Sequence, residues 1–273
     1  MPLNVLLAGG ADAPMIHAFA KAAQDAAGGG DVYMTHGPFR RAHEIDEVRA
    51  LTRRHDIGLI VPTLDDDLPL WAALSGSFAA EGAHVAVSPG STVAMCHDRH
   101  VMCRSLNLMG ISAAASWLPA QVSKDLPMPL VVLSRNPRQG VEPVRVDSYP
   151  ELDHLLSQRP DSVVQARLDG HEFEVDVCCD LTGRLLTVAP SEFAELAVCV
   201  VSALHLTGPA TIHGTLVGDR PVMRAISPRL SAALDLSQGA GARVPVELLE
   251  MALERRGRTG KFGGVSAAMG AVA

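Results

Sequence analysis

Short apolar runs alternate with helical patterns over residues 3–87, and this alternation constrains the fold more than any other feature of the chain. The apolar runs, each of which reads as a buried strand, lie at 3–8, 31–34, 58–62 and 84–87. Helical patterns separate them at 12–27, 43–55 and 65–81. A β-α-β-α order predicts a parallel sheet with right-handed crossover connections, and ligands of such sheets bind near the carboxyl ends of the strands.

From residue 128 onward, the pattern changes to strands joined by tight turns. Strand-like runs lie at 128–133, 162–166, 172–179, 185–189, 211–217 and 221–226. The turns Asp180–Gly183 and Gly218–Asp219 predict two hairpins. Helical patterns lie between and after these strands, at 148–157, 192–205, 230–239 and 246–256. This part of the chain is therefore predicted to be an antiparallel sheet with helices, of the α+β type.

Composition excludes two classes of partner. The net charge is −7 and the sequence pI is about 5.8, which does not favour a nucleic-acid partner because phosphates need a basic face. No apolar run reaches the roughly 18 residues that a membrane span needs. The first residues have no positive segment ahead of the apolar stretch, so we expect no signal peptide and a cytoplasmic protein.

Six short motifs, taken together and in chain order, resemble those of the ATP-grasp superfamily, in its carbamoyl-phosphate-synthase-like branch of carboxylate–amine ligases. They are Val61–Leu70, Ser88–Pro89 with His97–Arg99, Leu106–Ile111, Val163–Gly170, Glu172–Val177 and Ala225–Arg229. The resemblance implies an α/β chain with a Rossmann-like domain at 1–92 and ATP-grasp lobes at 93–256. The small lobe would span about 115–165 and the large lobe about 166–256. The glycine-rich segment 257–273 is expected to be a disordered tail.

Several residues match positions that bind the nucleotide in this family. The resemblance implies that Arg99 contacts phosphate and that Glu172 receives the ribose hydroxyls. It also implies that the main chain of Gln165, Ala166 and Leu168 borders the adenine. Arg229 corresponds to an arginine near the acyl phosphate, which would make it the catalytic residue of an active enzyme. Its alternative role is structural, tying the strand end to a neighbouring helix.

Other positions depart from the family pattern. Leu133 replaces a phosphate-binding lysine, and the glycine-rich loop is reduced to 136–140, where Pro137 removes an N–H donor. Arg135 and Arg138 are placed to compensate in part. The loss of the lysine and of most of the loop leads us to expect ATP binding that is weakened.

The positions of the family's metal ligands have also changed. They are occupied here by His213, Ala225 and Ser227. Magnesium prefers carboxylate oxygens, whereas imidazole suits zinc or nickel. We therefore expect no metal site, and magnesium binding is in doubt. His213 has three readings: a strand histidine with satisfied hydrogen bonds, a catalytic base, or a new metal ligand.

The run Asp65–Asp66–Asp67 is the strongest acidic cluster of the first half of the chain. It can be read as a metal site, or as anions that favour the N-terminus of the following helix. The helix reading is preferred, because a helix N-terminus stabilises negative charge without any ligand.

These observations leave three functional hypotheses. The first is a degenerate ATP-grasp protein that binds a small molecule or an active paralogue without catalysing ligation. The second is an active ATP-dependent carboxylate–amine ligase that forms an amide through an acyl phosphate. The third is a sensor of a small metabolite, bound at the strand ends near Gly9–Gly10 and Asp65. A homodimer is compatible with all three.

Overall fold

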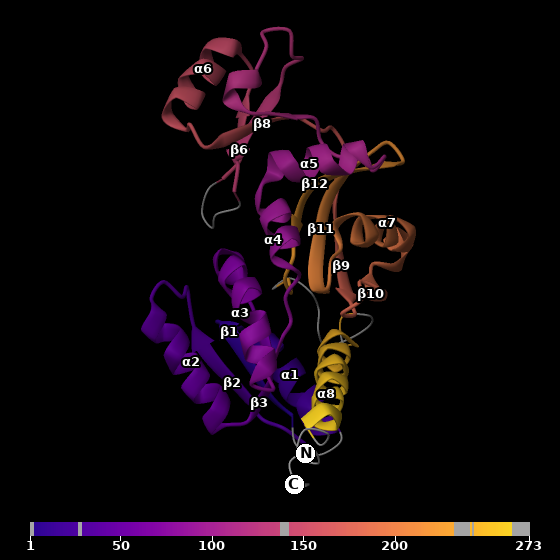
Figure 1. The fold of residues 1–273 in the computed structure, drawn as a ribbon. Coiled ribbons are helices and arrows are strands. Elements are labelled where there is room, and N and C mark those ends of the chain that lie inside the picture. Colours follow the sequence, from indigo (N-terminus) through magenta and orange to yellow (C-terminus); the bar gives the residue numbers. More distant parts are fainter. Residues whose placement is uncertain (1–2, 27–28, 137–141, 232–240, 242, 264–273) are drawn as a thin grey trace, which may run out of the picture.

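Three four-stranded sheets follow one another along an elongated molecule, with the N-terminal sheet at one end and the small lobe at the other (Figure 1). The computed structural model describes residues 3–26, 29–136, 142–231, 241 and 243–263, with backbone only over 257–263. In this described part, every helix is too short or too polar to cross a membrane.

The N-terminal sheet is parallel throughout, as predicted, with the strand order β2-β1-β3-β4. Its strands are β1 (Asn4–Gly9), β2 (Val32–His36), β3 (Ile57–Pro62) and β4 (His84–Val85). The crossover helices are α1 (Ala13–Asp25), α2 (Ala42–Arg54) and α3 (Leu68–Ala80). Every residue of β3 is buried, because helices cover both faces of the sheet. Asp12 caps α1 as expected, accepting a hydrogen bond from the Met15 amide at 2.9 Å.

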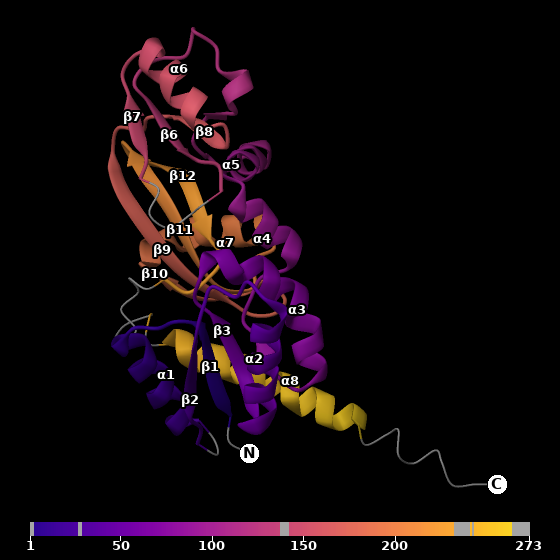
Figure 2. The same cartoon turned by 90° about the vertical axis from the view of Figure 1, so that its left-hand side faces the viewer.

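The last helix, α8 (Arg243–Gly263), differs from the sequence expectation in place and in length. It was assigned to the large lobe, but Leu248 and Leu249 pack with Phe19 of α1 and Leu59 of β3 against the parallel sheet. Figure 2 shows α8 running across this domain beside β1 and β3. The helix also continues past Arg256 to Gly263, so the first part of the segment expected to be disordered is helical.

The small lobe is an antiparallel sheet of order β5-β8-β6-β7. Its strands are β5 (Ser116–Trp117), β6 (Leu130–Ser134), β7 (Val144–Val146) and β8 (Ser162–Ala166). One helix, α6 (Tyr149–Gln158), covers it through the buried Leu152. Sequence patterns did not predict β5 or β7, because two or three residues are too few to show a period.

The large lobe is an antiparallel sheet of order β10-β9-β11-β12. Its strands are β9 (His171–Cys179), β10 (Leu185–Ala189), β11 (Gly208–Val217) and β12 (Arg220–Ser227), and both predicted hairpins are confirmed. One face packs against the helices α4 (Gly90–His97), α5 (Arg99–Leu108) and α7 (Ala194–Leu204). The helix expected at 230–239 lies almost entirely outside the described residues.

On β9, the alternation of side chains decides what each face of this sheet can do. Phe173, Val175 and Val177 enter the core, so Glu172 and Glu174 project from the opposite face. That polar face is turned toward the small lobe, and the space between the two sheets holds the candidate site described below.

One pH-dependent contact joins α8 to the parallel sheet and leads to a prediction. His84 of β4 is 5% exposed, and its Nδ1 lies 3.1 Å from Nη1 of Arg255. Burial, and to a lesser degree the positive charge of Arg255, lower the pKa of His84 to about 4. Between pH 6.5 and pH 4 the unfolded chain therefore binds a proton that the folded chain does not.

The free energy of unfolding should consequently fall by roughly 3 kcal/mol as the pH is lowered from 6.5 to 4. Urea unfolding at several pH values measures this, and His84→Gln should flatten that part of the profile. His17→Gln, at an exposed site on α1, is the matched control. A profile that His84→Gln leaves as steep as in the unaltered protein would contradict the prediction.

Candidate functional site

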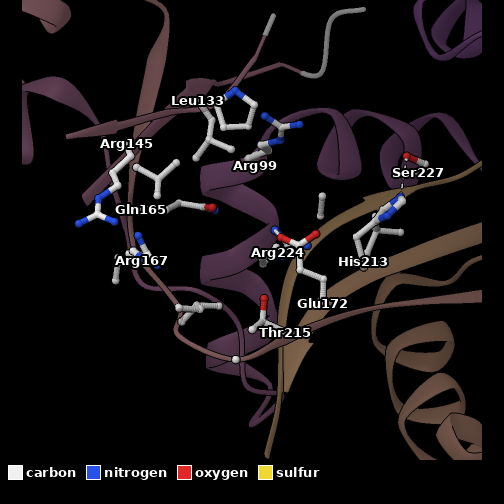
Figure 3. A pocket seen from close by; sticks show the side chains of 17 residues that line it. Arg99, Leu133, Arg145, Gln165, Arg167, Glu172, His213, Thr215, Arg224 and Ser227 are labelled. Carbon is white, nitrogen blue, oxygen red and sulfur yellow. Dashed lines mark hydrogen bonds and ion pairs between the residues drawn. The ribbon is translucent and has the colours of Figure 1, made fainter. Parts of the chain in front are cut away.

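A cavity of about 600 Å³ lies between the sheets of the two lobes (Figure 3). Its lining comes from β6, β7 and β8 of the small lobe, from β9, β11 and β12 of the large lobe, and from the first residue of α5. This volume falls within the range of small-molecule and cofactor sites.

Most of the residues that the sequence singled out meet in this cavity. The lining includes Arg99, Leu133, Gln165, Ala166, Leu168, Glu172, His213, Ala225 and Ser227. Arg135 and Arg229 are not part of it. The proposed loop residues 137–140, Arg138 included, lie outside the described residues.

The charge of the cavity is strongly positive. Among the described lining residues, four are arginines and Glu172 is the one carboxylate. Two of these arginines, Arg145 and Arg167, form exposed ion pairs with nearby aspartates. The distances are 2.7 Å from Arg145 to Asp147 and 2.9 Å from Arg167 to Asp169. Arg99 and Arg224 supply the remaining positive charge of the cavity, and the ion pair between Arg224 and Glu172 balances part of it.

Arg99 and Arg224 are close enough for their charges to interact. Burial lowers the pKa of Arg99, and the positive charge of Arg224 lowers it further. The Nε of each arginine is buried and, within the described part of the chain, has no hydrogen-bond partner. Two half-buried like charges repel one another, and an anion bound between the lobes would relieve this repulsion.

Arg224 was missed by the sequence analysis, and a β-bulge explains its position. On the β11–β12 ladder, His213 pairs with Ala225 and Gly214 pairs with Met223, so Arg224 is the extra residue. A bulge turns two consecutive side chains to one face. Met223 faces the core, while Arg224 and Ala225 both line the cavity. A strict two-residue alternation cannot predict this.

The carboxylate of Glu172 forms an ion pair with Arg224. Its Oε1 accepts a hydrogen bond from Nη1 of Arg224 at 2.6 Å, although the carboxylate is 72% exposed. The carboxylate expected to receive ribose hydroxyls therefore has one oxygen engaged by a cation. A ligand hydroxyl would have to share or displace this contact.

Contacts behind the cavity hold the lining residues of α5 and of the small lobe. Nη1 of Arg99 donates to the carbonyl of Ser134 at 3.1 Å, and Nε2 of the buried Gln165 lies 3.4 Å from Sγ of Cys103. Arg135 is bound by Asp98, at 2.7 Å between Nη2 and Oδ2. Burial raises the pKa of Asp98, but hydrogen bonds from Arg135 and the Val101 amide lower it by more. Arg135 thus braces the start of α5 and does not reach the cavity.

The three positions where the family has metal ligands lie together but do not suit magnesium. They offer an imidazole, a methyl group and a hydroxyl, from His213, Ala225 and Ser227. Nδ1 of His213 lies 3.1 Å from Oε1 of Glu174, and its Nε2 lies 3.5 Å from Oγ of Ser227. In the described residues, no group of three or more histidine, cysteine, aspartate or glutamate side chains is placed to hold a metal ion. At these three positions the chain offers no carboxylate, the ligand that magnesium prefers.

Arg229 and the aspartate run form a separate contact between the N-terminal domain and the end of β12. Nε of Arg229 lies 2.8 Å from Oδ2 of Asp65, and both side chains are about one-fifth exposed. Asp66 pairs with the exposed Arg40 at 3.0 Å, and the buried Asp67 accepts the Phe39 amide at 3.0 Å. As expected, the run lies at the N-terminus of α3, where Asp67 is the N-cap residue, but no aspartate of the run makes a capping hydrogen bond to α3 through its side chain. Tertiary contacts account for all three.

Comparison with known proteins identifies the fold. No family model matches the sequence, and no curated protein sequence matches it. Solved structures do match. L-amino acid ligase from Bacillus licheniformis superposes with a TM-score of 0.69 at 18% identity, over 92% of this chain and 74% of that one. D-alanine–D-alanine ligase from Bacillus anthracis gives 0.66 at 14%, over 96% and 99%.

A third similar structure is N5-carboxyaminoimidazole ribonucleotide synthetase from Thermotoga maritima, with a TM-score of 0.65 at 16% identity over 91% of this chain and 76% of that one. The Bacillus anthracis ligase has also been solved in complex with ATP. At these identities the likeness shows the fold alone. It is the ATP-grasp fold, which confirms the fold that the sequence motifs predicted.

The contact between Asp65 and Arg229 yields a stability prediction. Asp65→Asn should lower the free energy of unfolding by about 1–3 kcal/mol, because a half-buried guanidinium loses its counter-charge. Asp66→Asn is the matched control, since its ion pair is exposed and should contribute less than about 1 kcal/mol. Chemical denaturation of the two variants measures the difference. Equal stability of both variants would show that the Asp65 contact is not a structural tie.

Proposed function

We propose that the cleft between the lobes binds a phosphate-bearing anion, ATP among the candidates, and that the protein does not use this ligand for magnesium-dependent ligation. One observation carries the proposal: Arg99 and Arg224 converge on a cavity whose remaining lining offers no carboxylate besides Glu172 in the described residues. Two partly buried guanidinium groups with a single carboxylate among the described lining residues leave a net positive charge, which favours an anionic ligand over an empty cleft.

The chemistry of arginine supports phosphate as the bound group. A guanidinium is a planar set of donors that matches two phosphate oxygens at once, and its charge persists at any physiological pH. Nη1 of each arginine is engaged, by the Ser134 carbonyl in one case and by Glu172 in the other. Within the described residues, no hydrogen bond engages Nη2 of either arginine, so these groups can donate to a ligand.

Three replacements and one contact support a binding protein over a ligase. Leu133 supplies no charge where the family has lysine, and Ala225 and Ser227 supply no carboxylate. Arg229, the residue matched to the acyl phosphate, contacts Asp65 instead of the cavity. Phosphoryl transfer depends on fixed positive charge around the transferred group, so these changes weaken the transition state more than the bound ligand.

A second candidate is an active ATP-dependent ligase with rearranged phosphate contacts. It is favoured by the position of Arg99, Gln165 and Glu172 in the cleft, where the sequence resemblance places nucleotide contacts. The proteins of similar structure are themselves named as ligases. A metabolite sensor at the strand ends is less favoured, because Asp65 is occupied by Arg229 and the carbonyl of Gly10 by Thr63.

Thermal melting and calorimetry with ATP in excess EDTA test the proposal. ATP should bind without magnesium, and a ligand at about 100 times its Kd stabilises by about 2.7 kcal/mol. Arg99→Gln and Arg224→Gln should each weaken binding about tenfold or more, because a charge-assisted contact contributes about 1.5–3 kcal/mol. Arg184→Gln is the control, since Arg184 is exposed in the hairpin next to Asp180 and outside the lining.

The outcomes separate the hypotheses. Binding that requires magnesium, with phosphate released when a carboxylate and an amine are added, would favour the ligase. Binding that neither arginine variant weakens would place the anion elsewhere. A metabolite that stabilises the unaltered protein and the Arg99→Gln variant, but does not stabilise Asp65 variants, would favour the sensor.

A gain-of-function pair tests the alignment of the cleft. Leu133 and Ala225 both line the cavity, at the positions where the family has lysine and a metal-binding glutamate. Leu133→Lys combined with Ala225→Glu should raise ATP affinity and make it magnesium-dependent, since it restores a cation and an oxygen ligand. Leu133→Met with Ala225→Ser is the uncharged control. The same affinity for both double variants would show that the two positions are misaligned.

A further inference from the structure

We propose that Ser227 is a nucleophile activated by His213 and Glu174, and that it takes an acyl group from an activated ester of an anionic acid. The three side chains form a chain of two contacts, carboxylate to imidazole and imidazole to hydroxyl. His213 and Ser227 both line the cleft, and Figure 3 shows the contact between them. The arrangement is that of a nucleophile, its base and the group that orients the base.

The sheet builds this arrangement through its register. Glu174 of β9 is directly opposite His213 of β11, and His213 is opposite Ala225 of β12. Ser227 lies two residues further along β12, so it is the diagonal neighbour of His213 on the same face. The methyl group of Ala225 leaves the imidazole free to reach across to that diagonal position. A long or charged residue at 225 would compete for the same space.

The contact with Glu174 also sets the protonation of the imidazole. An ionised carboxylate only accepts hydrogen bonds, so the 3.1 Å contact requires that Nδ1 of His213 carries the proton. In the neutral imidazole, Nε2 is the unprotonated nitrogen, and it faces Oγ of Ser227 at 3.5 Å. A hydroxyl with this neighbour can pass its proton to Nε2 as it attacks, and such contacts often shorten when substrate binds.

The surroundings of Ser227 suit a reactive hydroxyl better than a buried structural one. Its side chain is partly exposed and opens on the cavity, at the last residue of β12 and just before Pro228. The imidazole of His213 is 27% exposed and Glu174 is 54% exposed, so both can be reached by solvent. A hydrogen bond between a serine and a histidine that served only packing would gain little at such exposure.

The substrate class follows from the charge of the cleft. Arg99 and Arg224 line the same cavity as Ser227, so the cavity attracts a ligand that carries negative charge. A carboxylate or phosphate elsewhere in the ester would bind these guanidinium groups. This preference for an anionic ester rests on the anion binding proposed above, whereas the reactivity of Ser227 does not.

In the proposed step, Oγ of Ser227 attacks the acyl carbon while its proton moves to Nε2 of His213. The bond from the acyl carbon to the leaving oxygen breaks, and the protonated imidazole returns the proton to the departing alcohol. The product is an acyl ester on Ser227 with one alcohol released. Water, activated by the same imidazole, then hydrolyses the ester and regenerates the hydroxyl.

The test uses the whole protein and two chromogenic esters, 4-nitrophenyl hemisuccinate, which carries a carboxylate, and the uncharged 4-nitrophenyl acetate. Mass spectrometry of the quenched unaltered protein should find the acyl group on the peptide that contains Ser227. Nitrophenolate release should fall by at least about 100-fold in Ser227→Ala and in His213→Gln, the usual effect of losing a nucleophile or its base. Ser202→Ala, at an exposed position on α7, should release nitrophenolate at the rate of the unaltered protein.

Glu174 acts through His213 and is a positioning residue. Glu174→Gln should lower the rate of acylation at saturating ester, with the ester concentration for half-maximal rate unchanged. A purely structural role would instead lower the melting temperature and leave the rate per folded molecule as it was.

Two results would overturn the proposal. One is an acyl group found on lysines and not on Ser227, and the other is nitrophenolate release that persists in Ser227→Ala. Either can occur while ATP still binds, in which case the anion-binding function stands alone. If both esters acylate Ser227 at equal rates and ATP does not bind, the result would support Ser227 as a nucleophile and contradict the proposed anion site.

Discussion

The large-lobe sheet must bury one face, and the rest of the site follows from this constraint. Its apolar side chains pack against α4, α5 and α7, so the alternating positions on β9 and β11 are forced toward the small lobe. Glu172, Glu174 and His213 therefore share a face without any local signal that would bring them together. The position of the cleft is a result of core packing, and its chemistry depends on which residues occupy the other half of the alternation.

Sequence patterns predicted the parts of the fold that rest on local chemistry. The parallel order of the N-terminal strands, the Asp12 cap and both hairpins follow from periodicity, capping and turn residues. Sequence patterns did not predict the position of α8. The pattern of an amphipathic helix reveals that one face is apolar, but it does not reveal which sheet packs against that face. The ion pairs of the aspartate run were not predicted for a related reason: its partners Arg229 and Arg40 are distant in sequence.

The sequence indicated which residues line the candidate site better than it indicated the contacts that these residues make. Matching to a family pattern brought most of the lining residues to attention, yet Arg224 had no motif to identify it. A bulge shifts the alternation of inward and outward side chains by one residue, and the residues around Arg224 carry no sequence signal that predicts this shift. The ion pair between Arg224 and Glu172 and the contacts of His213 are cross-strand effects, which depend on register. Register is set by the whole sheet.

The docking of α8 on the first sheet has a consequence for how the chain is made. Synthesis proceeds from the N-terminus, so β1, β2 and β3 leave the ribosome long before Leu248 and Leu249 exist to cover them. The apolar surface that α8 covers in the N-terminal domain therefore stays exposed while both lobes are translated. The apolar face that α8 covers can therefore be completed only after α8 has been synthesised, and apolar surface exposed until then makes an incompletely folded chain prone to aggregate.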